Sequence, residues 1–197
     1  LKEIGLSKEE IGEIFPKPPM LQVYDFFYGK SKKIPKSLNQ VWDEKEKLHE
    51  NLPGNTNRLE HLFLHIFSSF NFVTMNVAPL KIEGVDVVCF YPETLDLLVI
   101  GCTTGILKDD LQKMDALVKE MKAKMTELLE KCSVTPIVVS SKMASITPSD
   151  AQYAAETKIV IMQHGHIDTL LEMLNTNRKS REVMKYIKSC IKYPRVV

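Results

Sequence analysis

The residue with the clearest chemical potential in this sequence is Asp86, a carboxylate inside an apolar segment. Val85, Val87 and Val88 surround it, which is typical of a strand whose side chains face a core. A buried carboxylate is costly unless it is paired. This position therefore favours a functional role for Asp86, either present or ancestral.

A second group with chemical potential follows the next apolar run. Gly101-Cys102-Thr103-Thr104-Gly105 comes directly after the stretch 95–100, which is apolar at nearly every residue. Hydroxyl and backbone groups placed after a central strand could donate to a phosphate, or the segment could simply turn the chain. Cys102 is interpreted as a small buried side chain, because the sequence fixes no histidine near it that would activate a thiolate.

Two pairs of histidines are candidates for metal ligands. His61 and His65 are four residues apart, so they share a helix face, which is the geometry of a two-histidine metal pair. No third ligand lies near them in the sequence. His164 and His166 flank a glycine after an apolar run and are interpreted as part of a turn. We therefore assign no metal to either pair.

Composition excludes several classes of protein. The chain has 197 residues, of which 44% are hydrophobic and 26% charged, so a disordered chain, a collagen and a coiled-coil rod are excluded. This length indicates one domain, or one domain with an appendage. The net charge of +1 argues neither for nor against a polyanionic partner. No Walker loop, GxGxxG or GxSxG motif is present.

The cysteines and the apolar runs indicate the cellular setting. The four cysteines are far apart and form no CxxC pair, which argues against a zinc knuckle and favours a reduced, cytoplasmic setting. No apolar run approaches the roughly 18 residues of a membrane span, and we recognise no signal peptide. We expect no membrane segment. The first residue is Leu1 rather than Met, so we expect further domains in the same chain.

The positive charge gathers at the end of the sequence. Residues 178–197 hold seven basic residues against Glu182, a net of +6. This tail is either a solvated helix face or a surface that contacts phosphates, and Lys185, Lys188 and Lys192 are the contacts we name. If most of the cations engage duplex DNA, log affinity should fall against log salt with a slope between about −3 and −6.

The elements that position these residues fall into two parts. Residues 1–52 are interpreted as an appendage, with a short helix that begins with a capping box at Ser7, an extended proline stretch at 16–19 and an apolar cluster at 21–28 that must pack on something. Pro53 and Gly54 break the chain. Residues 53–197 form the second part.

The second part predicts an α/β domain with a mixed central sheet of about five strands flanked by helices. Residues 95–102 should form a central strand, and helix 56–70 should lie on one side of the sheet while helix 108–131 crosses over. The predicted helices are 56–70, 108–131, a short helix from Thr147-Pro148, 167–174 and 181–191, and the predicted strands are 72–77, 84–90, 95–102, 134–140 and 158–163.

This order of elements resembles the restriction-endonuclease-like fold of the PD-(D/E)xK nuclease superfamily. The resemblance covers residues 56–175 and depends on the segments 58–63, 84–90, 98–105 and 157–162. It implies that Asp86 binds a divalent metal, that an acid of the first helix, here Glu60, completes the metal shell, and that a lysine helps to position a water for attack on a phosphodiester. Mg²⁺ suits such a site because it prefers hard oxygen ligands.

The sequence departs from the family motif at one place. Gly101-Cys102-Thr103 stands where the family has Glu-x-Lys, and it resembles a branch that reads Glu-Cys-Thr-Thr-Gly, with Gly in place of Glu. In that branch the lysine comes from the next helix, so Lys113 is the best candidate here and Lys108 the second. Displaced carboxylates could come from Glu60, Asp109 or Asp110. Because one charge is lost, we expect weak Mg²⁺ binding.

Three functions remain as hypotheses. The first is a nuclease-like domain that binds nucleic acid, DNA in preference to RNA, through a divergent site that has Asp86, Glu60 and Lys113 as its candidate residues and that is reduced in activity or inactive. The second is an active metal-dependent endonuclease with a rearranged site. The third is a non-catalytic oligomerisation or protein-interaction module, and a homodimer is left open.

Overall fold

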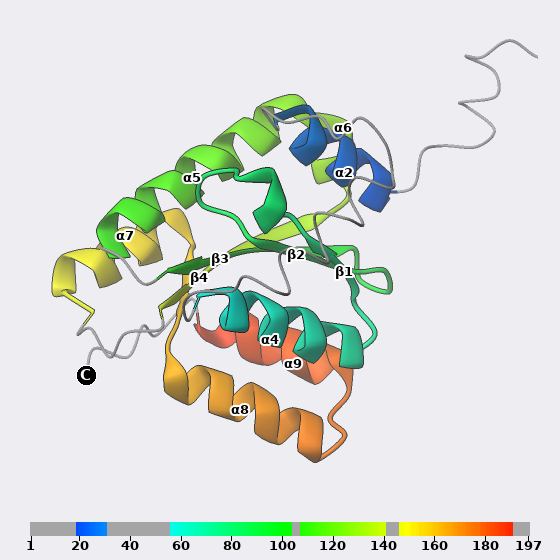
Figure 1. Ribbon diagram of the computed structural model, residues 1–197, viewed down its shortest axis with the longest axis vertical. Coiled ribbons are helices and arrows are strands. Elements are labelled where there is room, and N and C mark those ends of the chain that lie inside the picture. Colours follow the sequence, from blue (N-terminus) through cyan, green and yellow to red (C-terminus); the bar gives the residue numbers. More distant parts are fainter. Residues whose placement is uncertain (1–18, 31–55, 104–106, 141–145, 191–197) are drawn as a thin grey trace, which may run out of the picture.

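The apolar runs rich in valine and isoleucine form the strands of one sheet, as the β-propensity of these side chains predicts. The structure is a computed structural model, and it describes residues 19–30, 56–103, 107–140 and 146–190. Helices cover both faces of the five-stranded sheet (Figure 1). The predicted α/β class and the predicted mixed sheet are confirmed.

The strands follow one another across the sheet in chain order. Strands β1 (Val73–Asn76), β2 (Val87–Tyr91) and β3 (Asp96–Thr103) pair antiparallel, and β4 (Ser133–Ser140) and β5 (Val160–Met162) continue the sheet in parallel. Strand β3 is therefore the central one, and nearly all of its residues are buried. This confirms the predicted central strand.

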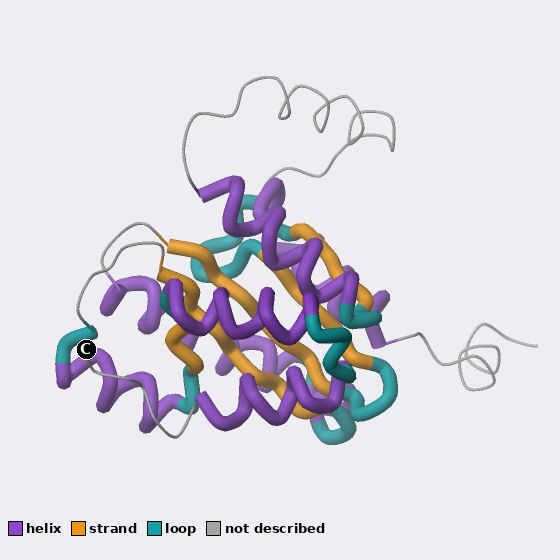
Figure 2. The backbone as a smooth tube through the Cα atoms, turned by 90° about the horizontal axis from the view of Figure 1, so that it is seen from below, coloured by secondary structure: helices purple, strands orange, loops and turns teal. Residues whose placement is uncertain are grey.

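Helices form a layer on each side of the sheet (Figures 1 and 2). One layer contains α4 (Thr56–Ser69), α8 (His164–Asn175) and α9 (Ser180–Cys190). The opposite layer contains α2 (Pro19–Lys30), α5 (Leu107–Lys124), α6 (Thr126–Leu129) and α7 (Pro148–Thr157). A short 3-10 helix, η2 (Ala78–Leu80), lies between β1 and β2. The predicted positions of the helices 56–70 and 108–131 are confirmed.

The core has two halves because β3 presents alternate side chains to the two layers. Leu97 and Val99 pack against the α5 layer, and Leu98 and Ile100 pack against the α4 layer. Each of the four is at most 1% exposed. Full burial of such a side chain stabilises the folded state by about 1.5–3 kcal/mol, so the central strand is firmly held from both sides.

Part of the apolar cluster at 21–28 packs on the same core. It forms α2, whose Val23 and Phe27 are 1% and 0% exposed and belong to the α5 half of the core. Pro19 begins this helix rather than continuing an extended stretch, since proline suits the first helical turn. The predicted helix after Ser7 and the predicted boundary at 52/53 lie outside the described residues.

The predicted helix 108–131 is two helices, α5 and α6. Met125 interrupts it, with φ −121° and ψ 38°. The apolar spacing hides this break, because Met121, Met125, Leu128 and Cys132 are all buried in one core cluster. The hydrophobic period continues across Met125, so periodicity alone predicts one helix.

Two helix starts show how capping decides the ends of elements. Helix α7 begins as predicted at Thr147-Pro148, with Thr147 and Asp150 forming a capping box. The predicted turn at His164 and His166 is wrong, because both residues belong to the first turn of α8. The His166 ring Nδ1 accepts the Gln163 N–H at 3.1 Å, so a histidine takes the capping role that a Glu or Gln usually has.

Candidate functional site

Asp86 is held at the carboxyl end of the central strand. Its N–H donates to the Ile100 carbonyl at 2.8 Å, and its carboxylate Oδ2 accepts the Cys102 N–H at 2.6 Å. It precedes β2 rather than lying within it. The bond to Cys102 gives Asp86 a structural partner and offsets part of the cost of burying a carboxylate. Within the described residues, no hydrogen bond engages Oδ1.

Glu60 lies on α4 and brings a second carboxyl group to the same place. The residue is only 8% exposed. Burial, and after it the negative charge of Asp86, raises the pKa of Glu60 to about 7. The two groups are therefore close enough to repel each other when both are ionised.

Asp110, in the first turn of α5, adds a third carboxylate. Burial raises the pKa of Asp86, the Cys102 N–H lowers it, and the charge of Asp110 raises it. The Thr103 hydroxyl donates to Asp110 Oδ2. The Lys113 ammonium lies 3.8 Å from Asp110 Oδ1. The end of β3 and the start of α5 are thus joined through polar side chains.

The structure therefore gathers Glu60, Asp86, Asp110 and Lys113 around the end of β3. They come from three separate segments, α4, the residues before β2, and α5. The other candidates on α5, Lys108 and Asp109, are exposed in its first turn. We name the three carboxyl groups with Lys113 the acidic site.

Close backbone packing requires a glycine at position 101, and the sequence alone does not reveal this packing. A Cβ built on Gly101 would lie 2.5 Å from the carbonyl oxygen of Gly84. Gly84 itself has φ +85°, a region that favours glycine, and a Cβ there would lie 3.1 Å from the backbone of Lys113. The chain has no room for a side chain at Gly101, so the family's Glu could not occupy this backbone. In the sequence, this close approach is signalled only by the glycines at positions 84 and 101.

The structure describes only part of the segment 101–105. Burial, with the charges of Asp86 and Glu60, raises the pKa of the Cys102 thiol. The thiol therefore stays protonated, in agreement with the interpretation of Cys102 as a packing residue. Thr103 is buried and bonded to Asp110, whereas Thr104 lies outside the described residues.

The histidines take other roles. His61 and His65 are exposed on α4, and the His164 ring lies 2.9 Å from Asp168 on the surface of α8. Among the described residues, no group of three or more His, Cys, Asp or Glu side chains is arranged to hold a metal ion. Within the same residues, no helix is long and apolar enough to cross a membrane. All four cysteines are free thiols.

One of the three named lysines of the basic tail, Lys188, lies at the other end of the central strand. Lys188 of α9 forms an ion pair at 2.6 Å with the buried Asp96, the first residue of β3. At about 3.3 Å per residue, this is roughly 23 Å along the strand from Thr103. Lys188 and the acidic site therefore lie at opposite ends of β3.

Several cations of the tail are engaged within the protein. Arg178 pairs with Glu182 at 3.5 Å, and Arg181 pairs with Glu93 at 3.5 Å. Lys185 is exposed. Lys192 lies outside the described residues. The described part of the tail thus offers fewer free charges than the sequence suggests.

No family model matches the sequence, and no curated protein matches it. The nuclease resemblance therefore depends on the residues and on the order of elements alone.

Proposed function

We propose that this chain is a nuclease-like domain that binds nucleic acid, DNA in preference to RNA, through a divergent metal-dependent phosphodiesterase site. The observation that carries this proposal is the gathering of Glu60, Asp86 and Asp110 at the end of the central strand. A site of this charge repels phosphate on its own, because the negative groups are partly buried. A divalent cation would turn that repulsion into attraction.

The residues present suit a weakly held Mg²⁺. Glu60 and the Oδ1 atom of Asp86 are hard oxygen ligands of the kind that Mg²⁺ prefers. The raised pKa of both groups reflects a charge that a cation would relieve. The described residues contain no three-ligand group, so waters and phosphate oxygens would complete the coordination.

Three groups of the chain, Glu60, Lys113 and the Cys102 N–H, would act together with the metal. A bound Mg²⁺ would lower the pKa of its water and neutralise charge on the phosphate. Glu60 would serve as a metal ligand, because a bound cation would hold its carboxylate in the ionised form. The Lys113 ammonium, whose side chain is 45% exposed, can stabilise negative charge on a phosphate. The Cys102 N–H fixes the orientation of Asp86.

The alternative of a protein-interaction module has less support. Docking surfaces of that kind expose large apolar side chains in a patch. Among the described residues, the large apolar side chain that is exposed is Val73, at 46%, on the edge strand β1. A single exposed valine is ordinary for a protein surface.

Duplex binding with and without Mg²⁺ tests the proposal. We expect Mg²⁺ to strengthen binding to a labelled duplex by about tenfold over EDTA at low salt, since each bridged charge contributes on the order of 1 kcal/mol. Asp86→Asn and Glu60→Gln should abolish this gain. Glu83→Gln is the matched control, because Glu83 is an exposed carboxylate close to Asp86 in the chain. Equal affinity in EDTA and Mg²⁺ for all four proteins would refute the proposed site.

A further inference from the structure

A hollow of about 650 Å³ opens at the end of the sheet opposite the acidic site. Its walls come from α5, α6, the start of β4, the end of α7, and α9. This volume lies within the range of small-molecule sites, about 300–1,000 Å³. Three lysines from three segments line it, Lys122, Lys158 and Lys188, and we name it the lysine hollow.

The charge of the lysine hollow is positive. Lys188 is paired with Asp96 at 2.6 Å, and Glu130 is the one acid that lines the hollow. The three ammonium groups against these two carboxylates leave an excess of one positive charge. Within the part of the chain that the structure describes, Lys122 and Lys158 have no carboxylate partner, so their charges are available to an anion.

The rest of the wall is mixed in character. Leu129 and Val134 contribute apolar surface, and Thr126 and Ser133 contribute hydroxyl groups. Small-molecule sites typically combine an apolar wall with a few converging polar groups. The hollow therefore suits a ligand with an apolar body and an anionic head.

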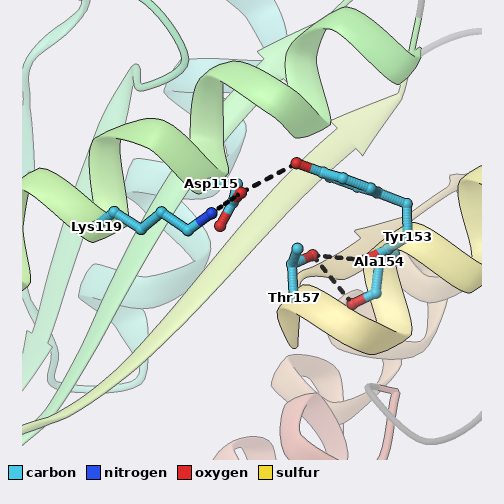
Figure 3. A network of polar contacts seen from close by, with 5 residues as sticks. All are labelled: Asp115, Lys119, Tyr153, Ala154 and Thr157. Atoms are coloured by element: carbon cyan, nitrogen blue, oxygen red, sulfur yellow. Dashed lines mark hydrogen bonds and ion pairs between the residues drawn. The ribbon is translucent and has the colours of Figure 1, made fainter.

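Polar contacts join α5, which carries Lys122, to α7, which ends next to Lys158 (Figure 3). Asp115 of α5 accepts hydrogen bonds from Lys119 at 2.7 Å and from Tyr153 of α7 at 3.0 Å. Lys122 lies one turn after Lys119 on α5, and Lys158 directly follows α7 as its C-cap. The contact thus ties together the two helices that bring Lys122 and Lys158 to the hollow.

We propose that the lysine hollow binds a small organic phosphate. The phosphate would lie against the ammonium groups of Lys122 and Lys158, since lysine serves as a point charge for phosphate. The apolar body would rest on Leu129 and Val134. This site is separate from the acidic site, so it does not depend on the proposed function.

Calorimetric titration with three probes tests the proposal. Naphthyl phosphate carries both the head and an apolar body, inorganic phosphate carries the head alone, and naphthol carries the body alone. We expect naphthyl phosphate to bind more tightly than either fragment. The double variant Lys122→Gln/Lys158→Asn should weaken its binding by about tenfold. Asparagine is chosen for Lys158 because that residue has φ +58°, which asparagine tolerates.

Lys185→Gln is the matched control, because Lys185 is exposed on α9 and lies outside the hollow. Its affinity for naphthyl phosphate should equal that of the wild type. Lys188 is kept in all variants, since it neutralises Asp96. Unchanged affinity in the double variant, equal binding of naphthol and naphthyl phosphate, or no binding of naphthyl phosphate at millimolar concentration would each overturn the proposal.

Discussion

Glu60 links the stability of the protein to pH. Its pKa is about 7 in the folded chain against 4.5 for an ordinary glutamate. Between these values the folded state binds more protons than the unfolded state does. The free energy of unfolding must therefore fall as the pH rises from about 4.5 through 7, which is the reverse of a carboxylate held by a salt bridge.

Replacement of Glu60 by Gln should remove this dependence. We expect the wild type to lose about 2 kcal/mol relative to Glu60→Gln between pH 5 and pH 8, since the neutral amide does not titrate. Urea unfolding at several pH values measures the difference. Glu83→Gln, at an exposed carboxylate, should follow the wild type. Parallel pH profiles for Glu60→Gln and the wild type would show that Glu60 is not buried as described.

The residues of the acidic site could be named from the sequence, but their contacts could not. Asp86, Glu60, Asp110 and Lys113 follow from the resemblance and from the apolar surroundings of Asp86. The hydrogen bond from Cys102 to Asp86 joins residues sixteen positions apart. It depends on the register of two strands, which a single sequence does not encode in any local pattern.

At the scale of elements, two glycines let β3, the segment before β2 and α5 approach one another closely. The carbonyl oxygen of Gly84 lies 2.5 Å from the position that a Cβ of residue 101 would take, and the backbone of Lys113 lies 3.1 Å from the position that a Cβ of Gly84 would take. Because backbone atoms line the contact, a side chain here cannot be accommodated by a change of rotamer. The acidic site owes its compactness to this pair.

Gly101→Ala should therefore be strongly destabilising. A Cβ 2.5 Å from a backbone oxygen forces the strand to shift, and we expect a loss of about 2–4 kcal/mol in the free energy of unfolding. Gly165→Ala is the control, because a Cβ there meets nothing within 4 Å and lies in a helix, where alanine is favoured. Chemical denaturation compares the two. A loss of less than 1 kcal/mol for Gly101→Ala would contradict this contact.

The elements themselves were largely predictable, and the exceptions have local causes. The spacing of apolar residues located every strand of the sheet, because turn residues or a change in that spacing mark where each strand begins and ends. The break at Met125 was hidden because α5 and α6 keep the same apolar stripe across it. The start of α8 was missed because His166 caps the helix through its ring, a signal that the usual capping rules do not contain.

At the scale of the whole molecule, charge is divided between the two ends of the central strand. Three carboxyl groups gather at the carboxyl end, and Lys122, Lys158 and Lys188 gather at the amino end. A strand of eight residues separates them. The near-zero total charge of +1 therefore conceals two regions of opposite sign, each of which can attract its own ligand.

The salt dependence of DNA binding should be shallower than the sequence alone predicts. Three of the seven cations of the tail, Arg178, Arg181 and Lys188, are engaged in ion pairs. With at most four left to contact phosphates, the slope of log affinity against log salt should be no steeper than about −4. A salt titration with two unrelated duplexes measures it.

Two charge-reversing substitutions test whether the basic tail, rather than positive charge elsewhere on the protein, contributes to DNA binding. Lys185→Glu should weaken binding to both duplexes equally, because phosphate contacts do not read sequence. Lys124→Glu makes the same change of charge on α5, on the other face of the sheet, and should have a smaller effect. Binding untouched by Lys185→Glu would remove α9 from the nucleic-acid surface.

The order of the strands has a consequence for the synthesis of the protein. Because the strands lie side by side in the order in which they are translated, each can join the sheet as it leaves the ribosome. Helix α9 must reach far back, with Ser180 bonded to Phe70, 110 residues earlier, and Lys188 paired with Asp96, 92 residues earlier. A nascent chain that stops before α9 leaves Asp96 without its lysine, with the Thr94 hydroxyl as a remaining partner, so the buried end of the central strand gains its counter-charge only when α9 has been made.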